Sequence, residues 1–72
     1  MTRTYKITTP VTSIDKEMDD KILDQLPESA FDQLGDPDGS GFHLDKNRRD
    51  LFFEKGVVQY VLGSDKASVL LD

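Results

Sequence analysis

The chain of 72 residues contains no cysteine, no tryptophan and a single histidine, His43. Without cysteine there are no disulfide bridges and no thiolate ligands, and one histidine cannot complete a Cys/His zinc site. A chain this short buries only about 60% of the surface that it exposes when unfolded, so packing must supply its stability. We therefore expect a single domain, residues 1–72, with one modest core and no cofactor.

The sequence also lacks a long hydrophobic run. Met1 is followed by the polar and charged residues 2–6, where a signal peptide or a membrane span would need a sustained apolar stretch. The Phe, Leu and Val residues of the second half argue against wholesale disorder. These features predict a folded, cytoplasmic protein without membrane contact.

Negative charge is concentrated in one segment. The formal net charge is −5, and it divides into +2 for residues 1–14, −7 for residues 15–38 and zero for residues 39–72. The acids of the middle segment are Asp15, Glu17, Asp19, Asp20, Asp24, Glu28, Asp32, Asp36 and Asp38. Because this balance repels phosphate groups over most of the surface, we expect a protein partner and no direct binding of nucleic acid.

The middle of the chain predicts two helices. A cap at Thr12 or Ser13 would start the first helix at Ile14, and Pro27 would stop it. Its apolar residues recur at intervals of four and should form one stripe against a sheet; they are Ile14, Met18, Ile22 and Leu26. Residues 28–34 predict a second short helix that ends at Gly35.

Strands are expected on either side of the helices. Residues 4–8 alternate apolar and polar side chains, whereas residues 36–41 (DPDGSG) are dense in turn formers and predict a loop. Residues 45–55 fit either a helix or a strand, and two adjacent phenylalanines favour the strand. Residues 57–62 and 67–71 predict two strands joined as a C-terminal hairpin. The prediction is an α+β fold: a small antiparallel sheet of about four strands, with one amphipathic helix and a second short helix packed on one face.

The first predicted helix carries carboxylates along its outer side. On a helical wheel Glu17, Asp20 and Asp24 fall within about 60° of one another, away from the apolar stripe. Like charges this close cost a few tenths of a kcal/mol per pair. The stripe is either the solvated side of an amphipathic helix or a docking face for a basic surface, and Glu28 joins it as a candidate partner-binding residue.

Residues 36–47 begin with a pattern that resembles the opening of an EF-hand calcium loop. The family's first four ligand positions fall on Asp36, Asp38, Ser40 and the Phe42 carbonyl. Asn47 stands where the family has a bidentate glutamate, and Asp45 would supply the missing carboxylate in a shortened loop. The resemblance implies an alternative function: a calcium-binding module that holds Ca²⁺ through Asp36, Asp38, Ser40 and Asp45.

The sequence offers little for catalysis. A Ser-His-Asp triad would need Ser40, His43 and Asp45, which are near neighbours that one loop cannot easily bring into the required geometry. No glycine-rich phosphate loop is present, and a chain of this size seldom encloses a cleft. We expect that the protein is not an enzyme.

The strand at residues 57–62 is apolar on both faces, and short helices can shield only one of them. A central position with a phenylalanine folded over it would cover the other face, and so would a homodimer formed through the C-terminal hairpin. By analogy with other small domains that lack catalytic groups, the sequence favours an inhibitor or immunity-type factor, of the kind that phages also encode. Such a factor would dock on a basic protein surface through Glu17, Asp20, Asp24 and Glu28.

Overall fold

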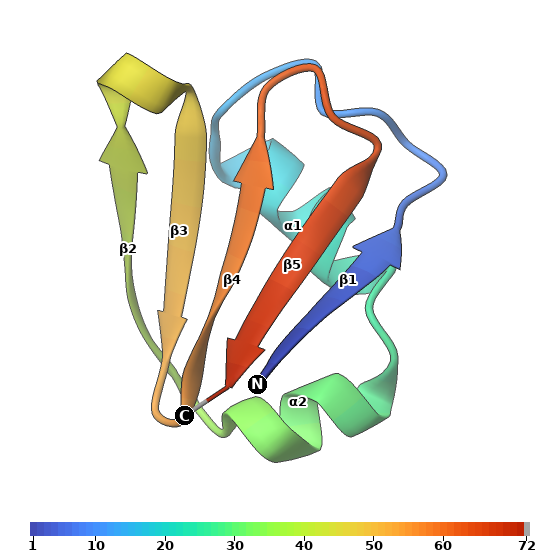
Figure 1. Ribbon diagram of the computed structural model, residues 1–72, viewed down its shortest axis with the longest axis vertical. Coiled ribbons are helices and arrows are strands. Elements are labelled where there is room, and N and C mark those ends of the chain that lie inside the picture. Colours follow the sequence, from blue (N-terminus) through green and yellow to red (C-terminus); the bar gives the residue numbers. More distant parts are fainter. Residues whose placement is uncertain (72) are drawn as a thin grey trace.

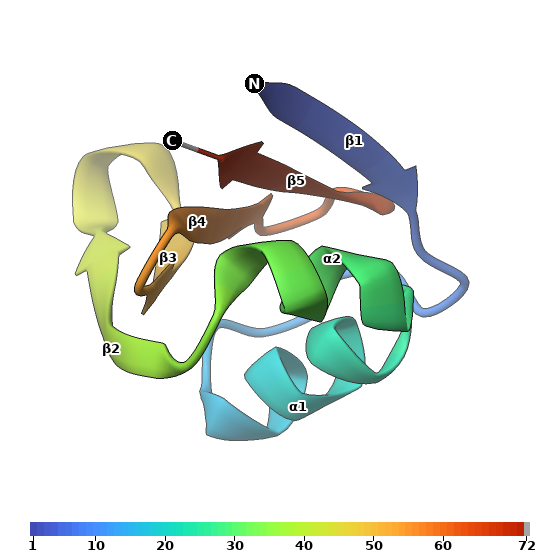
Figure 2. The same ribbon diagram turned by 90° about the horizontal axis from the view of Figure 1, so that it is seen from below.

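The computed structural model describes residues 1–71, and these form a five-stranded antiparallel sheet with two helices (Figure 1). The elements in chain order are β1 (Thr2–Lys6), α1 (Lys16–Asp24), α2 (Glu28–Leu34), β2 (Pro37–His43), the 3₁₀ helix η1 (Leu44–Lys46), β3 (Arg48–Phe53), β4 (Gly56–Val61) and β5 (Lys66–Leu71). The strand order is β1-β5-β4-β3-β2, so β4 lies in the middle and β1 and β2 are the edges. Figure 2 shows both helices on the same side of the sheet. The predicted α+β fold is confirmed, with one strand more than expected.

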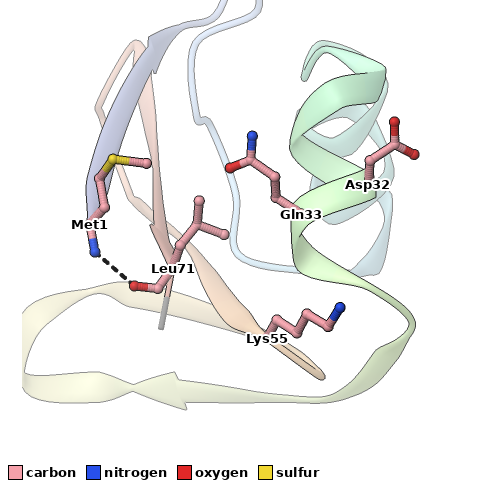
Figure 3. Close-up of a pocket in the computed structure, with 5 residues that line it drawn as sticks. All are labelled: Met1, Asp32, Gln33, Lys55 and Leu71. Atoms are coloured by element: carbon pink, nitrogen blue, oxygen red, sulfur yellow. Dashed lines mark hydrogen bonds between the residues drawn. The ribbon is translucent and has the colours of Figure 1, made fainter.

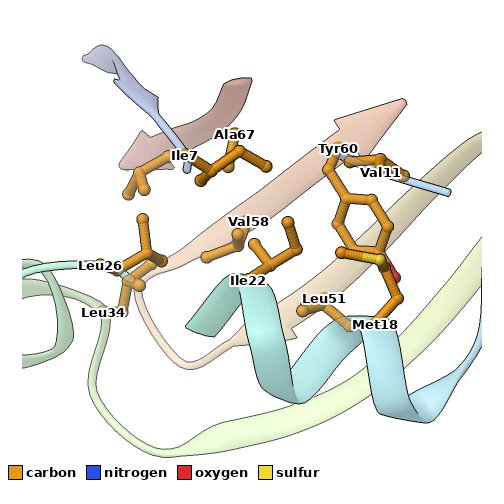
Figure 4. Close-up of a cluster of buried hydrophobic side chains, with 11 residues drawn as sticks. Ile7, Val11, Met18, Ile22, Leu26, Leu34, Leu51, Val58, Tyr60 and Ala67 are labelled. Carbon is orange, nitrogen blue, oxygen red and sulfur yellow. The ribbon is translucent and has the colours of Figure 1, made fainter. Parts of the chain in front are cut away.

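The core fills the space between the helices and the inner face of the sheet (Figure 4). Along β4, Val58 and Tyr60 are buried while Val57 and Gln59 are half-buried, as expected for a sheet covered on one face only. Phe31 of α2 packs against Phe53 of β3 with ring centroids 6.3 Å apart. The buried cluster draws on both helices, three strands and their connections: Ile7, Val11, Met18, Ile22, Leu26, Leu34, Leu51, Val58, Tyr60, Ala67 and Val69.

Helix α1 begins later than predicted. Asp15 caps it in place of Thr12 or Ser13, and the Asp15 carboxylate accepts a hydrogen bond of 2.8 Å from the backbone N–H of Met18. The segment before the cap lies alongside the turn between β4 and β5, because Val11 forms backbone hydrogen bonds of 2.9 Å with Ser64 and Gly63. These contacts keep the chain out of the helix until it reaches Asp15.

Two other helix and strand predictions are confirmed. Helix α2 occupies residues 28–34 and ends at Gly35, whose φ of 79° is a conformation that favours glycine. The ambiguous segment 45–55 contains strand β3 rather than a helix. Within residues 1–71 no helix is both long enough and apolar enough to cross a membrane.

The prediction of a loop at residues 36–41 is wrong, because Pro37–His43 form strand β2 and pair with β3. An edge strand pairs with a neighbour on one side only, so half of its backbone groups need no partner strand and it tolerates proline and glycine. The register of β2 against β3 shifts between Pro37 and Gly39, as at a β-bulge. A Cβ on Gly41 would lie 3.3 Å from the ring of Phe52. The ring therefore lies against the glycine and supplies packing that β2 itself lacks.

Candidate functional site

The four residues predicted to bind a partner are all exposed on the helical layer. Glu17, Asp20 and Asp24 lie on α1 and Glu28 is the first residue of α2; we call these four the acidic helix face. Within residues 1–71 none of the four forms an ion pair. Their carboxylates therefore face water without an internal partner, as the helical periodicity predicted for the three residues on α1.

Hydrogen bonds fix both ends of α1. Asp15 caps its N-terminus, and Gln25 follows its last turn. The Gln25 Oε1 atom accepts hydrogen bonds from the Thr8 backbone N–H at 2.5 Å and from the Thr8 hydroxyl at 2.9 Å, while Nε2 donates to the Lys21 carbonyl at 3.1 Å. Because Thr8 lies just after β1, these bonds tie the end of α1 to the chain leaving the sheet.

A third tie comes from Asp19, an acidic residue of α1 that is only 6% exposed. Arg49 of β3 contacts its carboxylate with two groups: Nη2 donates to Oδ2 at 2.8 Å and Nε to Oδ1 at 3.1 Å. The Tyr60 hydroxyl donates to Oδ1, and Arg49 Nη2 also donates to the Ser40 hydroxyl at 3.2 Å. This network joins α1 to strands β2, β3 and β4 from inside.

The position of Asp19 in the sequence already indicates that it is buried, although a count of charges does not distinguish it from the other acids. On the helical wheel Asp19 falls between Ile22 and Leu23, inside the apolar arc, while Asp20 falls outside it. A carboxylate in that arc needs a cation or hydrogen-bond donors when it is buried. The identity of those donors depends on the register of β3, which the sequence alone does not determine.

The network shifts the pKa of two of its members. Burial raises the pKa of the Tyr60 hydroxyl, and the hydrogen bond to the Asp19 carboxylate raises it further. The hydrogen bond to Asp19 also raises the pKa of Arg49 above its already high value. Tyr60 is therefore a neutral donor and Arg49 a permanent cation throughout the physiological range, and both hold α1 against the sheet.

A second buried carboxylate lies on the opposite face of β3. Asp50 is 4% exposed; its Oδ1 accepts from Arg48 Nε at 3.1 Å and its Oδ2 lies 2.9 Å from His43 Nε2. Ser40 meets Arg49 on the helix side instead, because alternate residues of β2 point to opposite faces. Ser40, His43 and Asp45 therefore do not converge as a catalytic triad.

The four candidate calcium ligands are spread along an extended segment. Asp36 precedes β2, Asp38 and Ser40 lie within it, and Asp45 lies in η1 beyond its end. A strand of this length separates its two ends by roughly 20 Å. Within residues 1–71 no three His, Cys, Asp or Glu side chains are placed to hold a metal ion together. The EF-hand-like loop is not formed, and calcium binding stays a prediction without the geometry on which it was based.

An open hollow of about 460 Å³ lies near the first residue of the chain (Figure 3). Met1 and Leu71 line one side, where the amino group of Met1 donates to the Leu71 carbonyl at 2.8 Å. Asp32 and Gln33 of α2 and Lys55 of the β3–β4 turn complete the lining. None of these residues was predicted to bind a ligand.

The most distinctive arrangement of charge on the helical side is thus an exposed acidic face on a helix anchored at both ends and from within. Exposed carboxylates attract cations and basic surfaces, and they need no cleft to do so. Comparisons with models of protein families, with curated proteins and with solved structures find no match for the chain.

Proposed function

We propose that this chain is a small cytoplasmic binding protein whose acidic helix face docks on a basic surface of a protein partner, and that it acts as an inhibitor or immunity-type factor. It works by occupying that surface rather than by catalysis. A groove that normally receives nucleic acid is one surface of this kind, because a row of carboxylates can take the place of phosphates.

One observation supports the proposal above the others: the acidic side chains of α1 divide into one that is buried and paired and three that are exposed and unpaired. Asp19 turns inward and is paired with Arg49, whereas Glu17, Asp20 and Asp24 stay exposed and unpaired within residues 1–71. Their mutual repulsion opposes helix formation, and a basic partner would relieve it. The anchored helix would present them without a large loss of conformational entropy on binding.

The proposal predicts the effect of reversing the charge of the face. The variant E17K/D20K/D24K, immobilised through a tag, should fail to capture the basic partner that the wild-type protein captures from a lysate and that mass spectrometry identifies. Far-UV circular dichroism checks that the variant is folded. Association of the wild-type complex should also slow as salt is raised, because exposed charges are screened within about 8 Å at physiological ionic strength.

The chain offers a matched control for net charge. Asp38, Asp45 and Asp65 are exposed and lie outside the two helices, so D38K/D45K/D65K changes the net charge by the same amount. This control should retain capture of the same partner. If E17K/D20K/D24K captures the partner as well as the control does, the acidic helix face is only the solvated side of the helix.

A further inference from the structure

Within residues 1–71 no helix or strand covers the face of the sheet opposite α1 and α2, as Figure 2 shows. The strand registers place one row of side chains across this face at the end where η1 lies: Lys6 is opposite Lys66, and Arg48 lies between His43 and Val61. We call the three cations Lys6, Lys66 and Arg48 the cationic row, and His43 lies beside Arg48 at its β2 end. It lies on the reverse side of a domain whose helical layer is acidic.

The two lysines form the least compensated part of the row. Like charges directly opposite one another on antiparallel strands are destabilising. Both Lys6 and Lys66 are exposed, and neither has an ion-pair partner within residues 1–71, whereas Arg48 and His43 share the buried carboxylate of Asp50. An anionic group docked across the row would relieve the repulsion between the lysines.

The spacing of the row matches that of the acidic helix face. Glu17 and Asp24 are separated by roughly 10 Å along the axis of α1, at 1.5 Å per residue. Lys66 and Arg48 lie on strands on either side of β4, which places them roughly 10 Å apart across the sheet. Between them lies Val61, which is 42% exposed. The row therefore has uncompensated lysines at one end of an apolar centre and Arg48, which is paired with Asp50, at the other.

From this complementarity we infer that the acidic helix face of one copy docks on the cationic row of a second copy. The inference rests on the proposed function, since it names one basic surface that the acidic face can occupy. The two faces are different and lie on opposite sides of the domain, so the contact is heterologous and adds copies in an open series rather than closing a symmetric dimer. Self-association of this kind would cover the acidic helix face when the protein is concentrated.

A second copy fits the row better than nucleic acid does. The net charge of −5 repels a dense polyanion, and only two lysines of the row are uncompensated. Two copies also repel each other at long range, but at physiological ionic strength charges more than about 8 Å apart are largely screened, so pairs in contact dominate. The acidic helix face presents few charges, at a spacing that the row can meet.

Sedimentation velocity across micromolar to millimolar concentration tests the inference. The wild-type protein should show a mass that rises with concentration without a plateau at the dimer, and molar salt should abolish the rise. K6E/K66E and E17K/D20K/D24K should each weaken association at least about tenfold, since each loses exposed pairs and creates like-charge contacts. A mixture of the two variants should associate again, because both reversed faces then meet an opposite charge.

The control for K6E/K66E is R3E/K55E, which makes the same charge change at exposed positions away from the row and should associate as the wild type does. Monomeric wild-type protein at all concentrations would overturn the inference, as would association that K6E/K66E leaves unchanged. Binding of a labelled oligo(dT) by the monomeric wild type, abolished in K6E/K66E, would overturn it in favour of nucleic acid.

The two proposals fail separately. K6E/K66E keeps the acidic helix face, so it should still capture the basic partner even though it no longer associates with itself. Loss of self-association with retained capture is therefore the expected result for this variant. A monomeric wild-type protein that captures the partner would leave the proposed function standing and remove only the second copy as an occupant.

Discussion

Replacing Asp19 by asparagine should lower the stability of this protein far more than the same change at its neighbour Asp20. Asp19 is 6% exposed and accepts hydrogen bonds from Arg49 and Tyr60, whereas Asp20 is exposed and unpaired within residues 1–71. Asparagine keeps one acceptor oxygen but loses the charge and presents an amide to the Arg49 guanidinium. The two substitutions change net charge equally, so they differ in environment alone.

The size of the effect follows from the groups that the substitution Asp19→Asn would leave unpaired. Removing one partner of a fully buried ion pair costs about 3–5 kcal/mol. Here the Arg49 side chain is 20% exposed and regains some hydration, while the buried Tyr60 hydroxyl keeps an acceptor only if the new amide turns its oxygen toward it. We expect D19N to cost about 2–4 kcal/mol, out of a total stability of roughly 4–11 kcal/mol for a chain of this length.

Urea denaturation followed by far-UV circular dichroism measures this difference. With a slope of about 1 kcal/mol per molar urea for a small domain, D19N should lower the midpoint by about 2–4 M, and D20N should shift it by less than about 0.5 M. The double variant D19N/R49M should recover part of the loss, because it removes the stranded cation as well. Equal midpoints for D19N and D20N would refute the idea that the network holds α1 to the sheet.

Two further variants test the Tyr60 hydroxyl and the packing around Gly56. The pKa of Tyr60 is raised in the folded protein. The stability that Tyr60 contributes is therefore complete at pH values below its unfolded pKa of about 10. Above that pH this contribution falls by up to about 1.4 kcal/mol per pH unit. Y60F should lack this alkaline loss, and parallel pH profiles of urea stability for the two proteins would contradict the assignment. Gly56→Ala would press a Cβ into the Leu70 carbonyl oxygen and place it 2.9 Å from Leu34. Overpacking of about 2 kcal/mol or more should lower the melting temperature by at least about 8 °C, and an unchanged melting curve would show that the chain relaxes freely there.

The elements that the sequence predicted well are those with local chemical signals. Pro27 and Gly35 bracket α2, and the periodicity of α1 identified the exposed carboxylates of the acidic helix face. The start of α1 was misplaced because backbone hydrogen bonds from Val11 to the distant β4–β5 turn override the local capping signals. Such contacts depend on the tertiary fold and leave no trace in a short window of sequence.

The missed strand and the missed network have a common cause. Pro37, Gly39 and Gly41 are turn formers by local preference, but at the edge of a sheet the pairing with β3 and the Phe52 ring outweigh that preference. The partners of Asp19 likewise become visible only once β3 and β4 are in register, since Arg49 lies directly opposite Tyr60. Both features therefore depend on the long-range register of the strands, which a short stretch of sequence does not encode.

The position of β1 has a consequence for the order of folding. Strands β2 to β5 follow one another in the chain and in the sheet, so each pairs with its predecessor across a short connection. Strand β1 instead pairs with β5, and this closes a loop nearly as long as the chain, since Met1 and Leu71 are 70 residues apart. Closing so long a loop carries the largest entropic cost, so we expect the four-stranded meander to form first and β1 to add last. In hydrogen exchange, the amides of β1 should then lose protection before those of the central strand β4.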